Sequence, residues 1–325
     1  AVGGSALAAN TTGTNNTAVG YASLTANTTA INNTAIGDYA LSANTTGAEN
    51  TAIGAAPLLS NTTGSANTAV GKYALVSNTT GAQNTASGLN ATYYNTTGDF
   101  NTSYGVAALQ ANTTADSNTA VGHSALTANT TGAANTALGY NSGPATTTGS
   151  SNVYLGRDTG ITGSPGGNNT EGNGAIFLGD ENIGDAHIQV DWTVASDARD
   201  KTDFTALDLG LDFVKALAPV TYKWDKRSKY GDKYADDYDL NAQTPDGTHK
   251  EDWLDIGFKA QEVQTLEEAA GYTTAAKKNL TVSTSGDGKQ MGLQYSKFVP
   301  ILVKAIQEQQ ALIESLTARI TTLEG

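Results

Sequence analysis

Few side chains in this sequence are of the types that catalyse reactions or bind metals. The chain has no cysteine and only three histidines, which excludes disulfides and thiolate sites and argues against a zinc site built from one copy. The acidic run from Asp232 to Asp239 lacks the spacing of a calcium loop, so we expect a solvated loop there. The first half of the chain has no recurring pair of carboxylates, so glycoside hydrolysis has no visible acid and base. No cofactor is expected.

Ser196 and Lys201 lie five residues apart and are the pair with the clearest chemical potential. A serine hydroxyl is a weak nucleophile until a base removes its proton. A lysine amine serves as that base only when neutral, which requires burial or nearby positive charge. Taken alone, a serine and a lysine at this spacing are most simply a solvated surface pair. Their interpretation therefore depends on the elements around them.

The charged residues are concentrated in the second part of the chain. Residues 1–195 hold 10 acidic and 2 basic residues and are rich in Asn, Thr, Ala and Gly, whereas the remainder has an ordinary globular composition. A domain boundary is expected near residues 190–196. The net charge of −13 argues against binding nucleic acid by neutralising phosphates. No apolar run approaches the roughly 18 residues of a membrane span. The N-terminus is already in mid-pattern, so we expect a cut from a longer protein and no signal peptide.

The first part of the chain repeats every 17 residues. Two motifs keep this period: Asn-Thr-Ala-(Val/Ile)-Gly from Asn16, and Asn-Thr-Thr from Asn10. A fixed short period indicates a solenoid, and 17 residues suit a β-solenoid coil of two short strands and two turns. The glycine of the first motif supplies the positive φ of a tight turn. Ala18 is expected to face away from Thr17 and Val19, and identical residues are expected to stack into ladders about 4.8 Å apart.

Two other interpretations of the repeat are weaker. A disordered low-complexity segment does not need a Val, Ile or Leu at the same phase in every repeat. Glycosylation at each Asn-Thr-Thr leaves the strict phase unexplained, so a structural turn is favoured. Each coil has few large side chains, and we expect association of three chains to supply the missing burial. The repeats resemble the heads of trimeric autotransporter adhesins and, more closely, repeats in phage tail fibres, over residues 1–156.

Beyond the regular repeats, the chain continues with a different kind of pattern. Residues 157–195 are expected to be an irregular Gly/Asn-rich end of the shaft and a linker, with residues 175–179 as a last, displaced coil. Five segments then follow in order: residues 196–201, 217–224, 256–263 and 293–300, and a helix to the C-terminus. Together these segments resemble the endosialidase-type intramolecular chaperone, the Ser–Lys autoproteolytic domain at the end of many phage tailspikes and fibres.

This resemblance implies a reaction as well as a fold. It places the scissile bond between Ala195 and Ser196, with Ser196 and Lys201 as the catalytic dyad of a single-turnover serine endopeptidase. Asp197 and Arg199 are candidate supporting residues. Asp255 stands where some relatives carry a histidine, which predicts slow or absent cleavage. The tryptophans, Trp192, Trp224 and Trp253, are expected to be core anchors.

The terminal helix, expected within residues 296–324, carries a heptad repeat. One seam position holds Val299, Ile306, Ile313 and Ile320, and the other holds Leu302, Gln309, Leu316 and Leu323. Spacing that alternates between three and four residues is typical of a coiled coil. Isoleucine at one position and leucine at the other favours dimers in simple peptides. The resemblance implies a trimer, the apolar face is widened by Val303 and Leu312, and Gln309 is expected to fix the register.

The sequence therefore predicts a mainly β protein with three parts. These are a trimeric β-solenoid shaft over residues 1–156, an irregular end over 157–195, and an α+β chaperone domain over 196–325 that ends in a coiled coil. The predicted function is a viral tail fibre whose C-terminal domain trimerises and folds an adhesive shaft. The alternatives are a bacterial trimeric surface adhesin and, with less support, a glycan-degrading tailspike.

The predicted partners follow from that function. They are two further copies of the chain, a host-surface receptor of glycan or protein, and the rest of the virion through sequence that precedes residue 1. Neither nucleic-acid binding nor membrane insertion is expected. The predicted location is the virion tail fibre, assembled in the host cytoplasm and extracellular after release.

Overall fold

A computed structural model describes residues 1–183, 187, 194–235, 237–273 and 280–324. The chain divides into two compact units. The first contains residues 1–183 together with residues 232–240, and the second contains the rest of the chain. Trp192 lies outside the described residues, so its predicted core role has no structural counterpart here.

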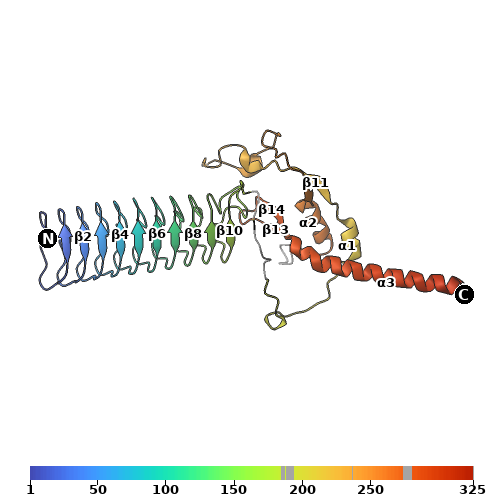
Figure 1. Ribbon diagram of the computed structural model, residues 1–325, viewed down its shortest axis with the longest axis horizontal. Helices are drawn as coiled ribbons and strands as arrows, with labels where there is room; N and C mark the ends of the chain where they lie inside the picture. Colours follow the sequence, from blue (N-terminus) through green and yellow to red (C-terminus); the bar gives the residue numbers. More distant parts are fainter. Residues whose placement is uncertain (184–186, 188–193, 236, 274–279, 325) are drawn as a thin grey trace. The chain divides into compact units, whose positions relative to one another are not determined.

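Ten three-residue strands stack in chain order into one parallel sheet in the first unit (Figure 1). The pairing is in register from coil to coil, with Thr17 opposite Thr34, Ala18 opposite Ala35 and Val19 opposite Ile36. The predicted β-solenoid of 17-residue coils is thereby confirmed. The strands are β1 (Thr17–Val19), β2 (Thr34–Ile36), β3 (Thr51–Ile53), β4 (Thr68–Val70), β5 (Thr85–Ser87), β6 (Thr102–Tyr104), β7 (Thr119–Val121), β8 (Thr136–Leu138), β9 (Val153–Leu155) and β10 (Ile176–Leu178).

Each regular coil contains one strand, whereas the sequence predicts two. After the strand the chain passes through turns in which ordinary residues adopt left-handed backbone angles, such as Ala22 at φ 53° and Leu24 at φ 49°. Extended strands need negative φ, so this stretch cannot form a second one. Its backbone still bonds to the next coil, as the Leu24 N–H does to the Ala40 carbonyl at 3.0 Å.

Alanines and leucines fill the interior of the solenoid. The middle residue of the strand is an alanine in most coils. Ala18 is fully buried, and it faces away from Thr17 and Val19 as predicted. A leucine from the turn segment, such as Leu24 or Leu41, lies beside the alanine column and is also fully buried. One chain therefore fills its own narrow interior. This corrects the expectation that a coil needs neighbouring chains to complete its core.

Two ladders of asparagine side chains hold the coils together. Asn61 of one ladder donates its side-chain amide to the Asn44 side-chain oxygen and to the Gly64 carbonyl, both at 2.9 Å. In the other ladder the Asn50 backbone N–H donates to the Asn33 side-chain oxygen at 2.9 Å. The asparagine of each Asn-Thr-Thr motif is fully buried from Asn27 onward. These residues are structural, which excludes the alternative of glycan acceptors at these positions.

The glycine that follows each strand is required by close contact between coils. Gly20 has φ 131°, a region that residues with side chains rarely adopt. A Cβ atom at Gly20 would lie 2.5 Å from the carbonyl oxygen of Gly37 in the next coil. Every coil stacks on the next in this way, so the motif retains its glycine.

The C-terminal end of the solenoid has a different core from the regular coils. Tyr154 stands in the alanine column of β9, and Gly143 replaces the leucine beside it. A Cβ at Gly143 would lie 2.7 Å from the Tyr154 ring, so the glycine makes room for the tyrosine. The buried ring stacks on Phe177 of β10 at 4.9 Å. β10 pairs with β9, which confirms the predicted displaced last coil.

Residues 232–240 pack against these last coils. The Lys233 amine lies 2.7 Å from the Glu181 carboxylate and 3.6 Å from that of Asp158. The Tyr234 hydroxyl donates to Asp158 at 2.6 Å, and the Asp158 side chain is fully buried. Burial lowers the pKa of Lys233, but the hydrogen bond to Glu181 and the two negative charges outweigh it and leave the pKa raised. Lys233 and Tyr234 thus anchor the segment on the last coils. The acidic run itself is solvated as predicted, since Asp232, Asp237 and Asp239 are exposed.

The second unit is a small α/β assembly. Its strands form two antiparallel pairs, β11 (Val220–Tyr222) with β12 (Asp255–Gly257) and β13 (Val282–Thr284) with β14 (Met291–Leu293). Its helices are α1 (Leu211–Ala216), α2 (Ala260–Ala269) and α3 (Phe298–Glu324). The core contains Leu209, Phe213, Val263, Val282, Phe298 and Ile301. The predicted α+β region with a long terminal helix is confirmed.

Short 3-10 turns complete the second unit, at Ala198–Asp200, Arg227–Lys229, Leu240–Ala242 and Tyr295–Lys297; residue 240 belongs to the first unit. Within the second unit, Glu308 of α3 accepts the Leu211 N–H at the start of α1 at 2.7 Å. This bond lowers the pKa of Glu308. Because the pKa of Glu308 is lowered in the folded state, this hydrogen bond stabilises the fold at neutral pH. The stabilisation is lost as the pH falls through that lowered pKa.

We predict that Asn61→Ala destabilises the solenoid by about 1–3 kcal/mol, because it leaves buried hydrogen-bonding groups on both neighbouring coils unpaired. Denaturant unfolding of the full chain, followed by circular dichroism, measures the change. The control is Thr63→Ala in the same turn, an exposed position where about 0.5 kcal/mol or less is expected. Equal effects of the two substitutions would contradict a structural role for the ladder.

Candidate functional site

The structure brings the predicted dyad into direct contact. The Lys201 amine donates to the Ser196 hydroxyl at 2.6 Å. A 3-10 turn at Ala198–Asp200 reverses the chain between them, and the Lys201 N–H closes it on the Ala198 carbonyl at 3.3 Å. Nucleophilic attack by Ser196 requires the same contact in the opposite direction: the hydroxyl gives its proton to a neutral Lys201 amine. The local fold therefore positions the two groups for that transfer.

The two candidate supporting residues hold this turn together. Asp197 caps it by accepting the Arg199 backbone N–H at 2.9 Å. The Arg199 side chain also binds the Asp197 carboxylate with two nitrogens, at 3.1 and 2.5 Å. The Arg199 side chain and then its backbone N–H lower the pKa of Asp197. In this geometry Arg199 orients the Asp197 carboxylate.

The dyad is open to solvent in the single chain. Ala195, Ser196 and Lys201 are all exposed. A lysine gives up its proton when it is desolvated or placed near positive charge, and the described surroundings of Lys201 provide little burial. The Ser196–Lys201 contact that the reaction needs is therefore present in the single chain. The burial of Lys201 that would favour its neutral form is not.

Tryptophans of the second unit are exposed, which corrects their predicted role as core anchors. Trp224 is 47% exposed and Trp253 is 84% exposed. The Trp224 indole N–H donates to Asp255 at 3.3 Å, and the Tyr222 hydroxyl lies 3.4 Å from the same carboxylate. Asp255 stands where the resemblance suggests a histidine. It is hydrogen bonded to Tyr222 at the end of β11 and to Trp224 two residues later.

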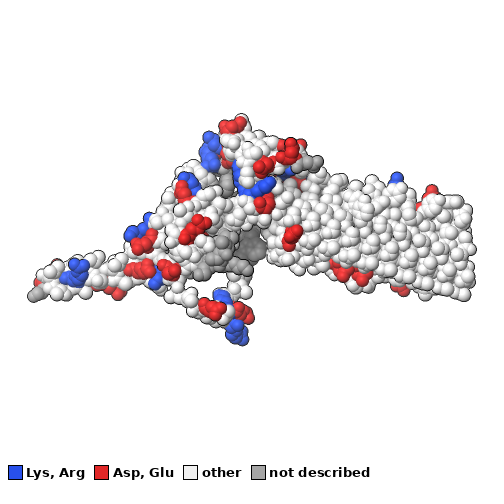
Figure 2. Space-filling model, turned by 180° about the vertical axis from the view of Figure 1, so that it is seen from behind, with Lys and Arg blue, Asp and Glu red and all other residues white. Residues whose placement is uncertain are grey.

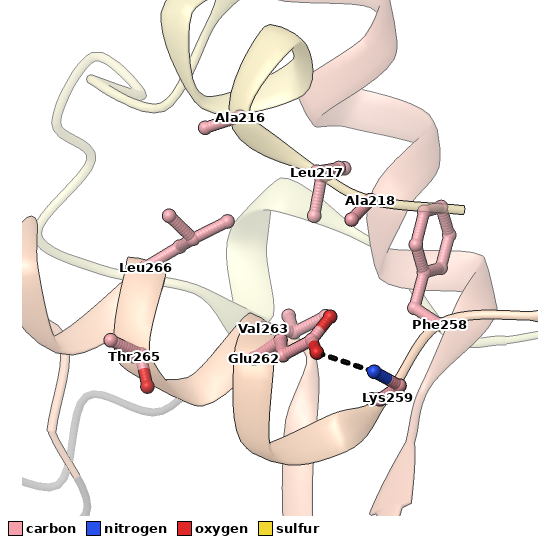
Figure 3. A pocket seen from close by; sticks show the side chains of 9 residues that line it. All are labelled: Ala216, Leu217, Ala218, Phe258, Lys259, Glu262, Val263, Thr265 and Leu266. Atoms are coloured by element: carbon pink, nitrogen blue, oxygen red, sulfur yellow. Dashed lines mark hydrogen bonds and ion pairs between the residues drawn. The ribbon is translucent and has the colours of Figure 1, made fainter. Parts of the chain in front are cut away.

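An apolar hollow lies between the end of α1 and helix α2 (Figure 3). Its walls are mostly aliphatic, and the ion pair between Lys259 and Glu262, 2.7 Å long, borders it. Neither Ser196 nor Lys201 lines this hollow. It therefore has no evident part in the predicted reaction.

The sequence did not reveal that Glu267 organises the second unit. This carboxylate on α2 is 1% exposed and accepts the backbone N–H of Thr281 at 2.7 Å and its hydroxyl at 2.5 Å. It fixes the entry to β13. Glutamate is common on helices, so only the contact with a residue 14 positions away distinguishes it.

Helix α3 exposes its predicted heptad seam. Seven seam residues are large and apolar, and each is at least 44% exposed: Val299, Leu302, Ile306, Ile313, Leu316, Ile320 and Leu323. Gln309 of the same seam is exposed too. The helix is anchored through other residues, Phe298, Ile301 and Ala305, which are buried in the second unit. The seam is thus unpartnered along the whole helix.

The solenoid surface differs from the rest of the chain in charge. Figure 2 shows few Lys, Arg, Asp or Glu side chains over the solenoid and many over the other parts. In the described ranges, no cluster of three His, Asp or Glu side chains is arranged to bind a metal ion. Among those residues no helix is both long and apolar enough to cross a bilayer.

Comparison with known proteins identifies part of the chain. Residues 196–272 match the family model described as chaperone of endosialidase, Peptidase S74. The match begins at Ser196 and includes three of the five segments that carried the resemblance. The fourth segment and the terminal helix lie beyond the matched residues. No curated protein and no solved structure matches the chain.

We predict that any self-processing cuts between Ala195 and Ser196, and that Ser196→Ala and Lys201→Ala each abolish it. The first variant removes the nucleophile and the second removes the base. Intact-mass spectrometry of the purified chain identifies the fragments. The rate is expected to rise with pH, because a larger fraction of the amine is then neutral.

Matched variants make this test specific. Thr205→Ala and Lys215→Ala change exposed residues of similar type and are expected to leave cleavage unchanged. Asp255→His is expected to speed a slow cut. A cut at another bond, or one that survives in Ser196→Ala, would rule out the dyad.

Proposed function

We propose that this chain, whose residues 196–272 match the chaperone of endosialidase, is a homotrimeric viral tail fibre segment. Its β-solenoid is the adhesive shaft, and its C-terminal part aligns three chains and folds them. The fibre is assembled in the host cytoplasm and becomes extracellular on the released virion. The observation that carries the proposal is the exposed apolar seam of α3 in a chain with this family match.

The seam of α3 gives the chain a reason to associate with itself. Residues 311–324 are exposed all round, and an isolated helix of this length is marginal in water. Burial of a large apolar side chain contributes about 1.5–3 kcal/mol, so packing seven such residues per helix stabilises both helix and assembly. Two further copies of α3 have the matching heptad, and Val303 and Leu312 widen the apolar face beyond a two-helix seam.

The solenoid has a second apolar surface that supports association. The third residue of each strand faces out, and in-register pairing aligns these residues into one row along the sheet. The row is aliphatic in eight of its ten positions, the exceptions being Ser87 and Tyr104: Val19, Ile36, Ile53, Val70, Val121, Leu138, Leu155 and Leu178. Because the same chemistry is present in nearly every coil, a second solenoid of the same kind is the partner that matches it.

A shaft of this kind needs an outside reference for alignment. Neighbouring coils are nearly identical, so two chains that slip by one coil lose only their end contacts. The heptad of α3 has one polar position, Gln309, and a single polar seam residue specifies register in coiled coils. Trimerisation that starts at the C-terminus sets the alignment before the coils form.

Cleavage at Ala195–Ser196 is the expected last step of maturation. The dyad is in contact but solvated, so packing by neighbouring chains is what would desolvate Lys201 and activate it. Cutting after assembly makes unfolding hard to reverse, because the aligning part is then no longer joined to the shaft. The outcome is kinetic stability.

We predict that light scattering of the full chain gives three copies and that Ile313→Asp prevents this, because it places a charge in the seam. Ser315→Asp is the control, since Ser315 lies on the same helix outside both seam positions. A well-folded monomer or dimer of the unmodified chain would contradict the proposal.

We also predict that a chain lacking residues 196–325 during expression yields an insoluble or misaligned shaft. Solubility, light scattering and electron microscopy of residues 1–195 measure this. The control is the full chain with Ser196→Ala, which keeps the aligning part and is expected to be soluble. Recovery of the same trimer from residues 1–195 alone would exclude the chaperone role.

A further inference from the structure

One coil of the solenoid, residues 88–104, departs from the others in its core. Thr92 occupies the leucine column and Ser103 the alanine column, and their hydroxyls are hydrogen bonded at 2.7 Å. Both side chains are buried. The apolar core ends at Ala91 on one side and resumes at Ala108 on the other. The only polar pair of this kind among the regular coils therefore interrupts an otherwise continuous apolar column.

This departure is unfavourable for the coil itself. Thr92 has φ 49°, a left-handed angle that is unusual for a β-branched residue. The neighbouring coils place leucine there, Leu75 and Leu109, which buries more apolar surface. Positions where a sequence breaks its own structural rules are commonly functional. The coil therefore has a feature that stability does not explain.

The outer surface of the same coil has a cluster of aromatic rings. The rings of Tyr93 and Tyr94 are 4.6 Å apart at 65°, and Tyr73 of the preceding coil is 6.2 Å from Tyr93 at 76°. The rings are partly open to solvent: Tyr94 is 52% exposed and Tyr73 is 36% exposed. The Lys72 amine lies 4.9 Å from the Tyr73 ring centroid. Lys72 is the only lysine or arginine in residues 1–156.

The tyrosine cluster does not repeat along the shaft. The residues equivalent to Tyr93 in the adjacent coils are Val76 and Gln110, and those equivalent to Tyr94 are Ser77 and Ala111. Contact between whole solenoids needs the same surface in every coil, as the aliphatic row of the strands provides. Another exposed tyrosine pair of the shaft, Tyr21 with Tyr39, has two rings and no adjoining lysine. A three-ring cluster with a lysine at one place suits a ligand of limited size.

We propose that Tyr73, Tyr93, Tyr94 and Lys72 form a binding site for a pyranose-containing glycan. Ring faces of tyrosine can pack against the C–H faces of sugar rings while their hydroxyls bond to sugar hydroxyls. Lys72 adds a cation for a carboxylate or phosphate on the glycan. The inference rests on the proposed adhesive role of the shaft and assigns that role to one coil.

The test compares the full chain with Tyr93→Val/Tyr94→Ser, which installs the residues of the preceding coil. The probe is an array of immobilised neutral and acidic oligosaccharides built from pyranoses. The double variant is expected to lose at least about tenfold in apparent affinity, the loss of two aromatic contacts. Tyr21→Ala breaks the other exposed tyrosine pair, Tyr21 with Tyr39, and is the control, expected to change binding by less than about twofold. Circular dichroism and light scattering verify that both variants fold and assemble.

Lys72→Gln separates the two glycan classes. Weaker binding to acidic members alone supports the anion contact proposed for Lys72. An equal loss on neutral and acidic members, or no loss on either, overturns that contact. No glycan binding by the unmodified chain, or full binding by Tyr93→Val/Tyr94→Ser, would overturn the site.

A second probe distinguishes failure of this site from failure of the adhesive role. Labelled full chain is applied to a panel of bacterial cells. Cell binding that survives in Tyr93→Val/Tyr94→Ser overturns the site and leaves adhesion in place. Array binding that is lost in the variant, without binding of the unmodified chain to any cell, supports the site and rejects the adhesive role on those cells.

Discussion

Each coil of the solenoid is held to the next by contacts between residues of the same type. Asparagine bonds to asparagine, alanine packs on alanine, and glycine lies against glycine where no Cβ fits. These contacts are strong because most of the buried asparagine side chains bond to a neighbouring coil, although Asn129 Oδ1 in one ladder has no partner in the described residues. These contacts do not distinguish one coil from another, because a given coil would stack equally well on any other regular coil.

The irregular features of the chain lie where that ambiguity must be resolved. Tyr154 and Phe177 close the core at one end of the shaft, and Gly143 has no side chain because the tyrosine needs its space. The buried charges of Asp158, Glu181 and Lys233 are specific to the same end. Polar contacts of this kind have one correct arrangement, so they mark a single position along a uniform array.

Sequence patterns predicted the features that recur and missed those that occur once. The 17-residue period predicted the stacked coils, because one strand and its buried Ala18 imply all the others. The turn segment was assigned a strand because left-handed angles at Ala22 or Leu24 leave no mark on residue type. The contacts of Lys233 and the exposure of Trp253 depend on chain segments far apart in sequence. The Ser196–Lys201 contact was foreseen from family resemblance, since its short local turn needs few distant residues.

The buried ion pairs of Lys233 mean that breaking the chain and separating its parts are different events. Residues 232–240 lie beyond the bond at Ala195–Ser196, yet they pack on the shaft before it. After a cut, the contact changes from an intramolecular one to a binding equilibrium, and the advantage of a high effective concentration is lost. Release of the C-terminal part is then governed by its dissociation rate. This rate is slow because a desolvated charge pair must be separated. A cleaved fibre would keep its former C-terminal part as a bound subunit for as long as that rate allows.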